Sequence, residues 1–141
     1  MENRHAEQIA KLLNDRNQLT QEYTAARVLQ LADRFLYRLD DAGKVMACVE
    51  VKKVQWYQFE ILHLSVTKAV ARTGKAAALL ADAERKAEDG GGRILQCTIR
   101  EGNTASESFF AKHGYTKMTS FLNHASGNRV GVWQKVVPSV L

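Results

Sequence analysis

The stretch Leu64–Leu80, LSVTKAVARTGKAAALL, carries an apolar strand pattern into a short loop and then into an alanine-rich helix. Gly74 and the small side chains around it let backbone N–H groups of the loop approach a ligand. The helix start adds unpaired N–H donors and roughly half a positive charge, and Lys68, Arg72 and Lys75 add cations. We therefore expect a phosphate-binding loop here; the alternative is a plain turn with solvated lysines.

Hydrophobic periodicity on both sides of this stretch predicts a mixed chain of helices and strands. The segment Phe59–Val66 is apolar almost throughout, which is typical of a central strand buried on both faces. Asn103 or Thr104 is expected to cap a short helix, with Glu107 completing a capping box and Gly114 ending the helix. The other predicted elements are helices over Ala6–Asp15, Glu22–Ala32 and 76–89, and strands over Phe35–Asp40, Val45–Val54, Ile94–Ile99, Thr116–Leu122 and Arg129–Val137.

This order of elements predicts the class α/β or α+β, with a mixed sheet and helices on its faces. The length of 141 residues fits a single domain, which we expect to cover residues 1–141. No apolar run reaches the ~20 residues that a membrane span needs. The start, MENRHAEQIAKLL, lacks the pattern of a secretory signal, so we expect a cytoplasmic protein without a membrane association.

Charge and cysteine usage narrow the choice of ligands. The net charge is +5, and basic and acidic residues balance through Asp40, so the whole excess falls on the later part of the chain. That part should attract a phosphorylated ligand or nucleic acid, unless the charge serves solubility alone. Cys48 and Cys97 stand in apolar, strand-like segments and are expected to be buried thiols. The histidines show no metal-ligand spacing, so no metal is predicted.

Two segments resemble the GNAT superfamily of N-acetyltransferases. Gly74-Lys75-Ala76, after a strand end, is similar to the family's pyrophosphate loop Q/R-x-x-G-x-G/A, although Ala71 stands where Gln or Arg is usual. The segment 103–115, NTASESFFAKHGY, is similar to the family signature N-x-x-A-x-x-[LF]-Y-x-x-x-G-F. The resemblance covers about Phe35 to Val137, and no counterpart of the family's first strand is evident before Glu7.

The resemblance implies acetyl-CoA as the acyl donor and a GNAT-like fold. That fold is a mixed, mostly antiparallel sheet with helices on both faces and a splayed pair of parallel strands. It implies that Asn103 both caps a helix and bonds the cofactor arm, and that Phe109 and Phe110 line the thioester channel. The pantetheine arm would pair with the backbone near Leu64, Ser65 and Val66. The phosphates would rest on Arg72, Thr73, Gly74, Lys75, Ala76 and Ala77.

Acyl transfer to an amine requires a base, donors for the developing oxyanion and a way to protonate the leaving thiolate. Glu60 lies inside an apolar strand, where a carboxylate would have a raised pKa suited to a base; a strand-edge glutamate in solvent is the alternative. His63 is a rival, on the opposite face from Glu60 if the strand is regular. Phe110 stands where many family members have a tyrosine that protonates the coenzyme, so Tyr115, Tyr57 or solvent would take that role.

The sequence thus predicts an acetyl-CoA-dependent N-acetyltransferase with an acceptor amine on a protein, a small metabolite or a nucleic acid. A different class remains open: because Ala71 and Phe110 depart from the family pattern, the fold could be a weakly catalytic module that binds coenzyme or nucleic acid. A third reading is transfer of another acyl group, because Phe109 and Phe110 could reshape the thioester channel. A homodimer through the closing hairpin is also possible.

Overall fold

The computed structural model describes residues 1–16 and 22–137 and contains one mixed six-stranded sheet. The sheet order is β1-β2-β3-β4-β6-β5, so β3 and β4 occupy its middle. Short 3₁₀ helices precede β1 and follow β3. The elements in chain order are α1(Asn3–Arg16), α2(Ala25–Gln30), η1(Ala32–Arg34), β1(Phe35–Leu39), β2(Val45–Gln55), β3(Gln58–Val66), η2(Lys68–Val70), α3(Lys75–Asp89), β4(Ile94–Arg100), α4(Thr104–Lys112), β5(Thr116–Leu122) and β6(Arg129–Val136).

The chain divides into two compact units. The first unit comprises residues 1–52 and 61–86, and the second comprises 53–60 and 87–141. Both β2 and β3 therefore have one part in each unit. The expected class, a mixed sheet with helices, is confirmed, and the first described strand is β1, after two helices. Among the described residues, no helix has the length and apolarity that crossing a bilayer requires.

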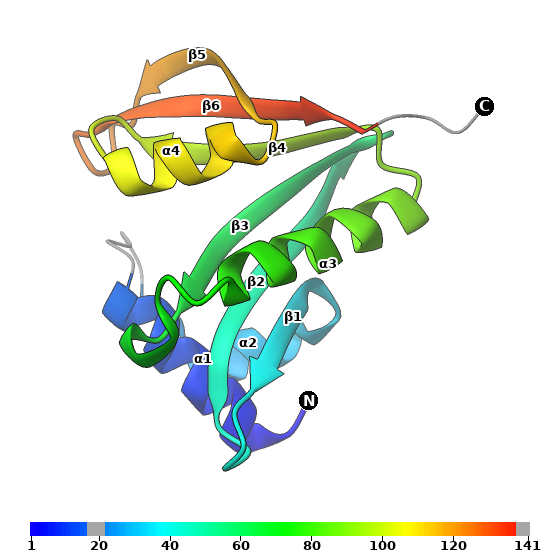
Figure 1. Cartoon of the computed structure of the whole chain (residues 1–141), viewed down its shortest axis with the longest axis vertical. Coiled ribbons are helices and arrows are strands. Elements are labelled where there is room, and N and C mark those ends of the chain that lie inside the picture. The colour runs from blue at the N-terminus through cyan, green and yellow to red at the C-terminus, as the bar shows by residue number, and fades with distance from the viewer. Residues whose placement is uncertain (17–21, 138–141) are drawn as a thin grey trace. The chain divides into compact units, whose positions relative to one another are not determined.

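The first unit has helices on both faces of its strands. One face of β1 and β2 packs against α1 and α2, because Ile9 and Leu13 of α1 and Val28 of α2 join Phe35 and Cys48 in one buried cluster. Side chains alternate along a strand, so Ala47, Val49 and Val51, which are also buried, face the other way. Figure 1 shows α3 on that other side of β1 and β2.

The second unit is organised around β4. This strand pairs in parallel with β3 over Gln58–Glu60 and antiparallel with β6 along its whole length, from Ile94↔Val136 to Arg100↔Val130. Leu95, Cys97 and Ile99 alternate into the core. At the far edge of the sheet β5 pairs only with β6 and is mostly exposed.

The thiols of Cys48 and Cys97 are buried as expected, and burial raises the pKa of each to about 12.

The strand Phe59–Val66 was expected to be buried on both faces, and this is wrong. In β3 only Phe59, Ile61 and Ser65 are buried, and the residues between them are partly exposed. The parallel register with β4 covers three residue pairs. The strand is central in order, as predicted, but the side chains of one of its faces are not part of a core.

The starts of α1 and α2 differ from the prediction, and α1 begins at Asn3 rather than Ala6. α2 begins at Ala25 rather than Glu22, because the side chain of Thr24 accepts a hydrogen bond from the Arg27 N–H (3.1 Å) as its N-cap. Of the two caps expected for α4, the structure has Asn103, whose side chain accepts a hydrogen bond from the Ser106 N–H (3.4 Å). Thr104 instead donates its hydroxyl to the Gly102 carbonyl, so the expected capping box of Thr104 with Glu107 is wrong.

We predict that Gly92→Ala destabilises the protein. An added Cβ at Gly92 would lie 2.7 Å from the Ala87 carbonyl oxygen and 2.9 Å from Cδ1 of Phe59, and backbone has little freedom to move aside. The expected loss is about 1–3 kcal/mol of unfolding free energy, measured by urea denaturation. Gly91→Ala is the control: its Cβ would meet open space, so only the left-handed backbone penalty of about 1 kcal/mol applies. Equal stability of Gly92→Ala and the wild type would contradict the close packing.

Candidate functional site

The loop between β3 and α3 is exposed and cationic. After Val66, the chain forms η2 and reaches Arg72 and Gly74, both with left-handed backbone (φ 64 and 84). The hydroxyl of Thr73 donates to the Val70 carbonyl at 2.5 Å. An added Cβ on Gly74 would meet no atom within 4 Å. The surface around Gly74 is therefore open, and the turn that holds it is fixed from within the loop.

The start of α3 is suited to an anion. The Ala78 N–H bonds the Gly74 carbonyl at 3.1 Å, so the N–H groups before Ala78 are those that a helix leaves without an intrahelical partner. The first turn holds no acidic residue, and its cation Lys75 lies at the positive end of the helix dipole. Arg72 and Lys75 are exposed. A phosphate group would satisfy the N–H donors and offset these charges.

The C-terminal part of β3 departs from regular strand geometry at His63. Its φ is +56, in the left-handed region that strands do not use. The Ser65 hydroxyl donates to the His63 carbonyl at 3.1 Å, and Ser65 is buried. The irregularity at His63 means that the simple alternation expected between Glu60 and His63 does not hold. Leu64 and Val66, also predicted to contact the cofactor arm, are partly exposed.

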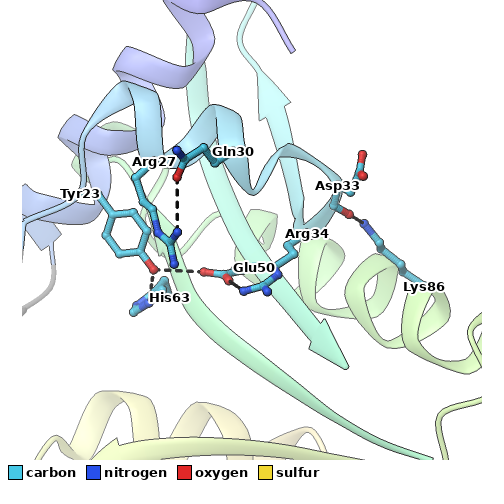
Figure 2. A network of polar contacts seen from close by, with 8 residues as sticks. All are labelled: Tyr23, Arg27, Gln30, Asp33, Arg34, Glu50, His63 and Lys86. Carbon is cyan, nitrogen blue, oxygen red and sulfur yellow. Dashed lines mark hydrogen bonds and ion pairs between the residues drawn. The ribbon is translucent and has the colours of Figure 1, made fainter. Parts of the chain in front are cut away.

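His63 belongs to a polar network inside the first unit (Figure 2). Its Nε2 lies 3.1 Å from the Tyr23 hydroxyl, and that hydroxyl donates to Oε1 of Glu50 at 3.2 Å. Glu50, on β2, is only 2% exposed, and its other oxygen pairs with Arg34 at 3.4 Å. The ring of Tyr23 meets the imidazole edge to face, with centroids 5.3 Å apart. Segments distant in sequence thus meet at one histidine.

Burial sets the charge state of the network. Burial lowers the pKa of His63, and the negative charge of Glu50 opposes this in part. Burial, the charge of Glu50 and the hydrogen bond to Glu50 together raise the pKa of Tyr23 to about 12. At neutral pH the imidazole is therefore unprotonated, and the phenol keeps its proton. A neutral imidazole can accept a proton, which is the property a general base needs.

The second unit contributes the helix cap and the aromatic residues that were singled out in the sequence. Asn103 is half-buried and caps α4. Phe110 is buried, with its ring edge to face against Phe109 (5.3 Å) and Tyr115 (5.2 Å). Tyr115 is 3% exposed, and the Lys135 ammonium lies 5.7 Å from its ring centre. Phe110 and Tyr115 are thus core residues of this unit, while Phe109 is partly exposed and stacks against His113.

Glu60 lies in the second unit, on the part of β3 that pairs with β4. It is opposite Gln96 in the parallel register and is partly exposed. Its charge acts on the neighbouring thiol: after burial, Glu60 is the second cause of the raised pKa of Cys97. The structure therefore places Glu60 beside Cys97, and His63 with Tyr23 and Glu50.

The predicted site residues fall into two groups. His63, the β3 end and the loop from Arg72 to Ala77 share the first unit; Glu60, Asn103, the two phenylalanines and Tyr115 share the second. The sequence analysis missed Tyr23, Arg34 and Glu50. A signal for Glu50 was present, because it is a carboxylate inside the otherwise apolar run 45–51. In the described residues, no group of three or more His, Cys, Asp or Glu side chains is arranged to hold a metal ion.

Solved structures share this fold along nearly the whole chain. Ard1 from Thermoplasma volcanium matches with a TM-score of 0.85 and 19% identity, over 99% of this chain and 95% of that one. The NatC complex bound to Gag peptide and CoA matches with a TM-score of 0.83 and 14% identity, over 97% of this chain and 93% of that one. A ribosomal-protein-alanine N-acetyltransferase from Brucella melitensis matches with a TM-score of 0.81 and 16% identity, over 97% of each chain. At these identities the likeness shows the fold.

The sequence itself decides the family. No curated protein matched the chain. Residues 4–115 match the acetyltransferase (GNAT) family. The match therefore includes the opening helices, which lie before the region, about Phe35 to Val137, that the motifs indicated. Because this match spans most of the 141 residues, the chain belongs to the acetyltransferase (GNAT) family and is an acyltransferase.

Proposed function

We propose that this protein is an acetyl-CoA-dependent N-acetyltransferase whose acceptor is the α-amino group of a polypeptide. The observation that carries acetyl-CoA binding is the open, cationic loop at Gly74 that leads into α3. Polypeptide acceptors are supported by the similar structures: one holds a peptide together with CoA, and another is named for the alanine of a ribosomal protein. The excess of basic residues after Asp40 suits a polyanionic donor.

The donor would contact the loop through its phosphates. The N–H groups from Gly74 to Ala77 and the side chains of Arg72 and Lys75 would hold the pyrophosphate, and Thr73 would keep the turn in shape through its bond to Val70. Ala71 supplies no polar side chain, so binding depends more on backbone donors. Bound acetyl-CoA supplies the activated acetyl thioester; the chain orients it and handles the protons.

The arm of the donor would extend along the end of β3. We propose that backbone groups of Leu64, Ser65 and Val66 pair with the arm and that one N–H there stabilises the oxyanion. Asn103 would donate its side-chain amide to the arm while its oxygen caps α4. Phe109 and Phe110 would border the acyl group, with Phe109 as the more accessible of the two.

Of the two candidate bases, we propose His63 rather than Glu60. Burial keeps the imidazole unprotonated at neutral pH, whereas Glu60 is partly exposed on the part of β3 that pairs with β4, beside Cys97. The leaving thiolate needs no dedicated acid, because a thiol has a pKa near 8.5. Tyr115 is 3% exposed, which favours a packing role over the proton donation expected for it.

The loop assignment predicts that Gly74→Glu abolishes binding of acetyl-CoA. The new carboxylate would face the pyrophosphate and repel it, so we expect at least a hundredfold loss of affinity, measured by calorimetric titration. Gly43→Glu is the matched control: Gly43 has the same left-handed backbone (φ 80) and the same open surroundings, but it lies in the turn before β2. Equal affinity of the two variants would refute the loop. Absence of binding in the wild type, with salt-dependent binding to nucleic acid instead, would favour a binding module.

The double role of Asn103 predicts a difference between two substitutions. Asn103→Asp keeps an oxygen that caps α4, so stability should stay within about 0.5 kcal/mol of wild type, whereas Asn103→Ala should lose about 1 kcal/mol. Only the asparagine has a side-chain N–H for the donor, so both variants should bind acetyl-CoA several-fold more weakly. Thermal unfolding and calorimetry separate the two roles. Wild-type affinity in Asn103→Asp would reduce Asn103 to a cap.

The acceptor class predicts acetylation of peptides at their N-terminus. We expect a peptide library with free α-amino groups to accept acetyl from acetyl-CoA, with the product located by tandem mass spectrometry. The matched control is the same library with blocked α-amino groups and free lysine side chains. Acetylation of the lysine library at the same rate would rule out the α-amino acceptor. Acetylation of a small amine but of neither library would also rule it out.

A further inference from the structure

We infer that Glu50 is a positioning residue: through the Tyr23 hydroxyl it fixes the tautomer of the His63 imidazole, with the proton on Nε2 and the Nδ1 lone pair available to the acceptor amine. This inference rests on the proposed function for the role of His63 in transfer. It concerns the state of the imidazole ring, which can be measured without any acceptor.

The burial of Glu50 requires the network. At 2% exposure, an ionised carboxylate needs charged or hydrogen-bonding partners to offset its lost hydration. Arg34 approaches one oxygen at 3.4 Å, and the Tyr23 hydroxyl donates to the other at 3.2 Å. Arg34 is itself 38% exposed along its side chain, so it keeps contact with solvent. In the Arg34–Glu50 pair, Glu50 is the more enclosed partner, and the Tyr23 hydroxyl donates to it.

Proton counting then assigns the histidine tautomer. A phenol has one proton to donate, and the Tyr23 proton is on the bond to Glu50. The contact of 3.1 Å between the Tyr23 oxygen and His63 Nε2 must then be donated by Nε2–H. In the opposite arrangement, Tyr23 would donate to the imidazole, and its lone pairs would face the Glu50 carboxylate in a buried site. The ionised carboxylate thus fixes the proton on Nε2 and leaves Nδ1 without one.

The charges around the ring agree with this state. In the described part of the first unit, the groups in contact with or acting on the network are Tyr23, Glu50, Arg34 and Arg27, with Arg27 hydrogen-bonded to Gln30 (3.4 Å). Glu50 favours an imidazolium, and burial disfavours it more strongly. His63 therefore accepts a proton from an acceptor amine and can release it again, because the same carboxylate stabilises the charged form only in part.

The backbone adds to the positioning. His63 has the left-handed φ of +56, which is uncommon for residues other than glycine. Its carbonyl accepts the buried Ser65 hydroxyl at 3.1 Å, and its ring is held against Tyr23. Both the main chain and the side chain of His63 are thus fixed by named partners.

The proton balance of the transfer follows. The acceptor enters as an ammonium ion, and one proton passes from its nitrogen to Nδ1 of His63. The neutral nitrogen forms a bond to the acetyl carbon, and the carbon–sulfur bond breaks with CoA leaving as a thiolate. The second proton of the nitrogen is lost as the amide forms, and it protonates the thiolate through solvent. His63 then returns its proton to solvent.

The test is a nuclear magnetic resonance titration of the imidazole rings in the whole protein. The chain has four histidines, and the spectrum of His63→Gln identifies the signal of His63. In the wild type we expect Nε2–H with Nδ1 unprotonated from the ¹⁵N shifts. In Glu50→Gln the titration of His63 should move to lower pH, because the pKa loses the contribution of the nearby negative charge. The control is Asp82→Asn, which removes a carboxylate paired with Arg38 and Arg85 in the same unit and should leave the titration of His63 unchanged.

Transfer kinetics provide the second readout. Tyr23→Phe and Glu50→Gln should lower kcat about tenfold, as part of the 10²–10⁴ that a general base supplies, while KM for the peptide stays near the wild-type value. The acid limb of kcat should move to lower pH in Glu50→Gln, in step with the titration of His63. Circular dichroism checks that each variant folds. If Glu50→Gln does not fold, the kinetics of Tyr23→Phe test the inference instead.

Several results would overturn the inference. A proton on Nδ1 in the wild type, or a titration of His63 that Glu50→Gln does not move, would refute the positioning role whatever the acceptor is. An acid limb that follows Glu60→Gln rather than the His63 variants would show that Glu60 is the base. If no acceptor is acetylated at all, the proposed function fails, and the tautomer and the titration still decide whether Glu50 positions the ring.

Discussion

The buried carboxylate of Glu50 constrains much of the first unit. β2 is buried from Ala47 to Val51, and Glu50 lies on the face that meets α2, where Phe35 is its partner across the strands. Because its charge cannot be left unpaired there, Tyr23 and Arg34 must lie where they reach it. Tyr23 and Arg34, and through Tyr23 the ring of His63, are therefore arranged around this one carboxylate.

β3 is irregular at His63, the residue that joins this network from the strand. A regular strand would turn successive side chains to alternate faces, but His63 takes a left-handed backbone while its ring meets Tyr23. The Ser65 hydroxyl donates to the His63 carbonyl at 3.1 Å. The chain then enters the loop at Thr67, whose N–H bonds the Met46 carbonyl at 2.9 Å. The segment that leads into the Gly74 loop and the polar network are thus both attached to β2, the first at Met46 and the second at Glu50.

Local patterns predicted most of the fold. Apolar and β-branched runs bounded by turn residues located all six strands to within about two residues. The start of α2 was missed because the cap by Thr24 is a single hydrogen bond. The exposure of one face of β3 was missed because apolar residues there suggested a core. Composition cannot tell a strand buried by helices from one that borders a site.

The candidate site was only partly predictable, for a reason that applies beyond this chain. The loop at Gly74 and the cap at Asn103 are local motifs, so their spacing in the sequence is informative. Tyr23, Glu50 and His63 come from α2's leading segment, β2 and β3, and only the register of the sheet brings them together. The argument applied to Glu60, a carboxylate within an apolar strand, applied equally to Glu50, and burial distinguishes them: the second is enclosed and the first is not. A single acid in a buried strand therefore implies hydrogen-bonding or charged partners, and here those partners are Tyr23 and Arg34.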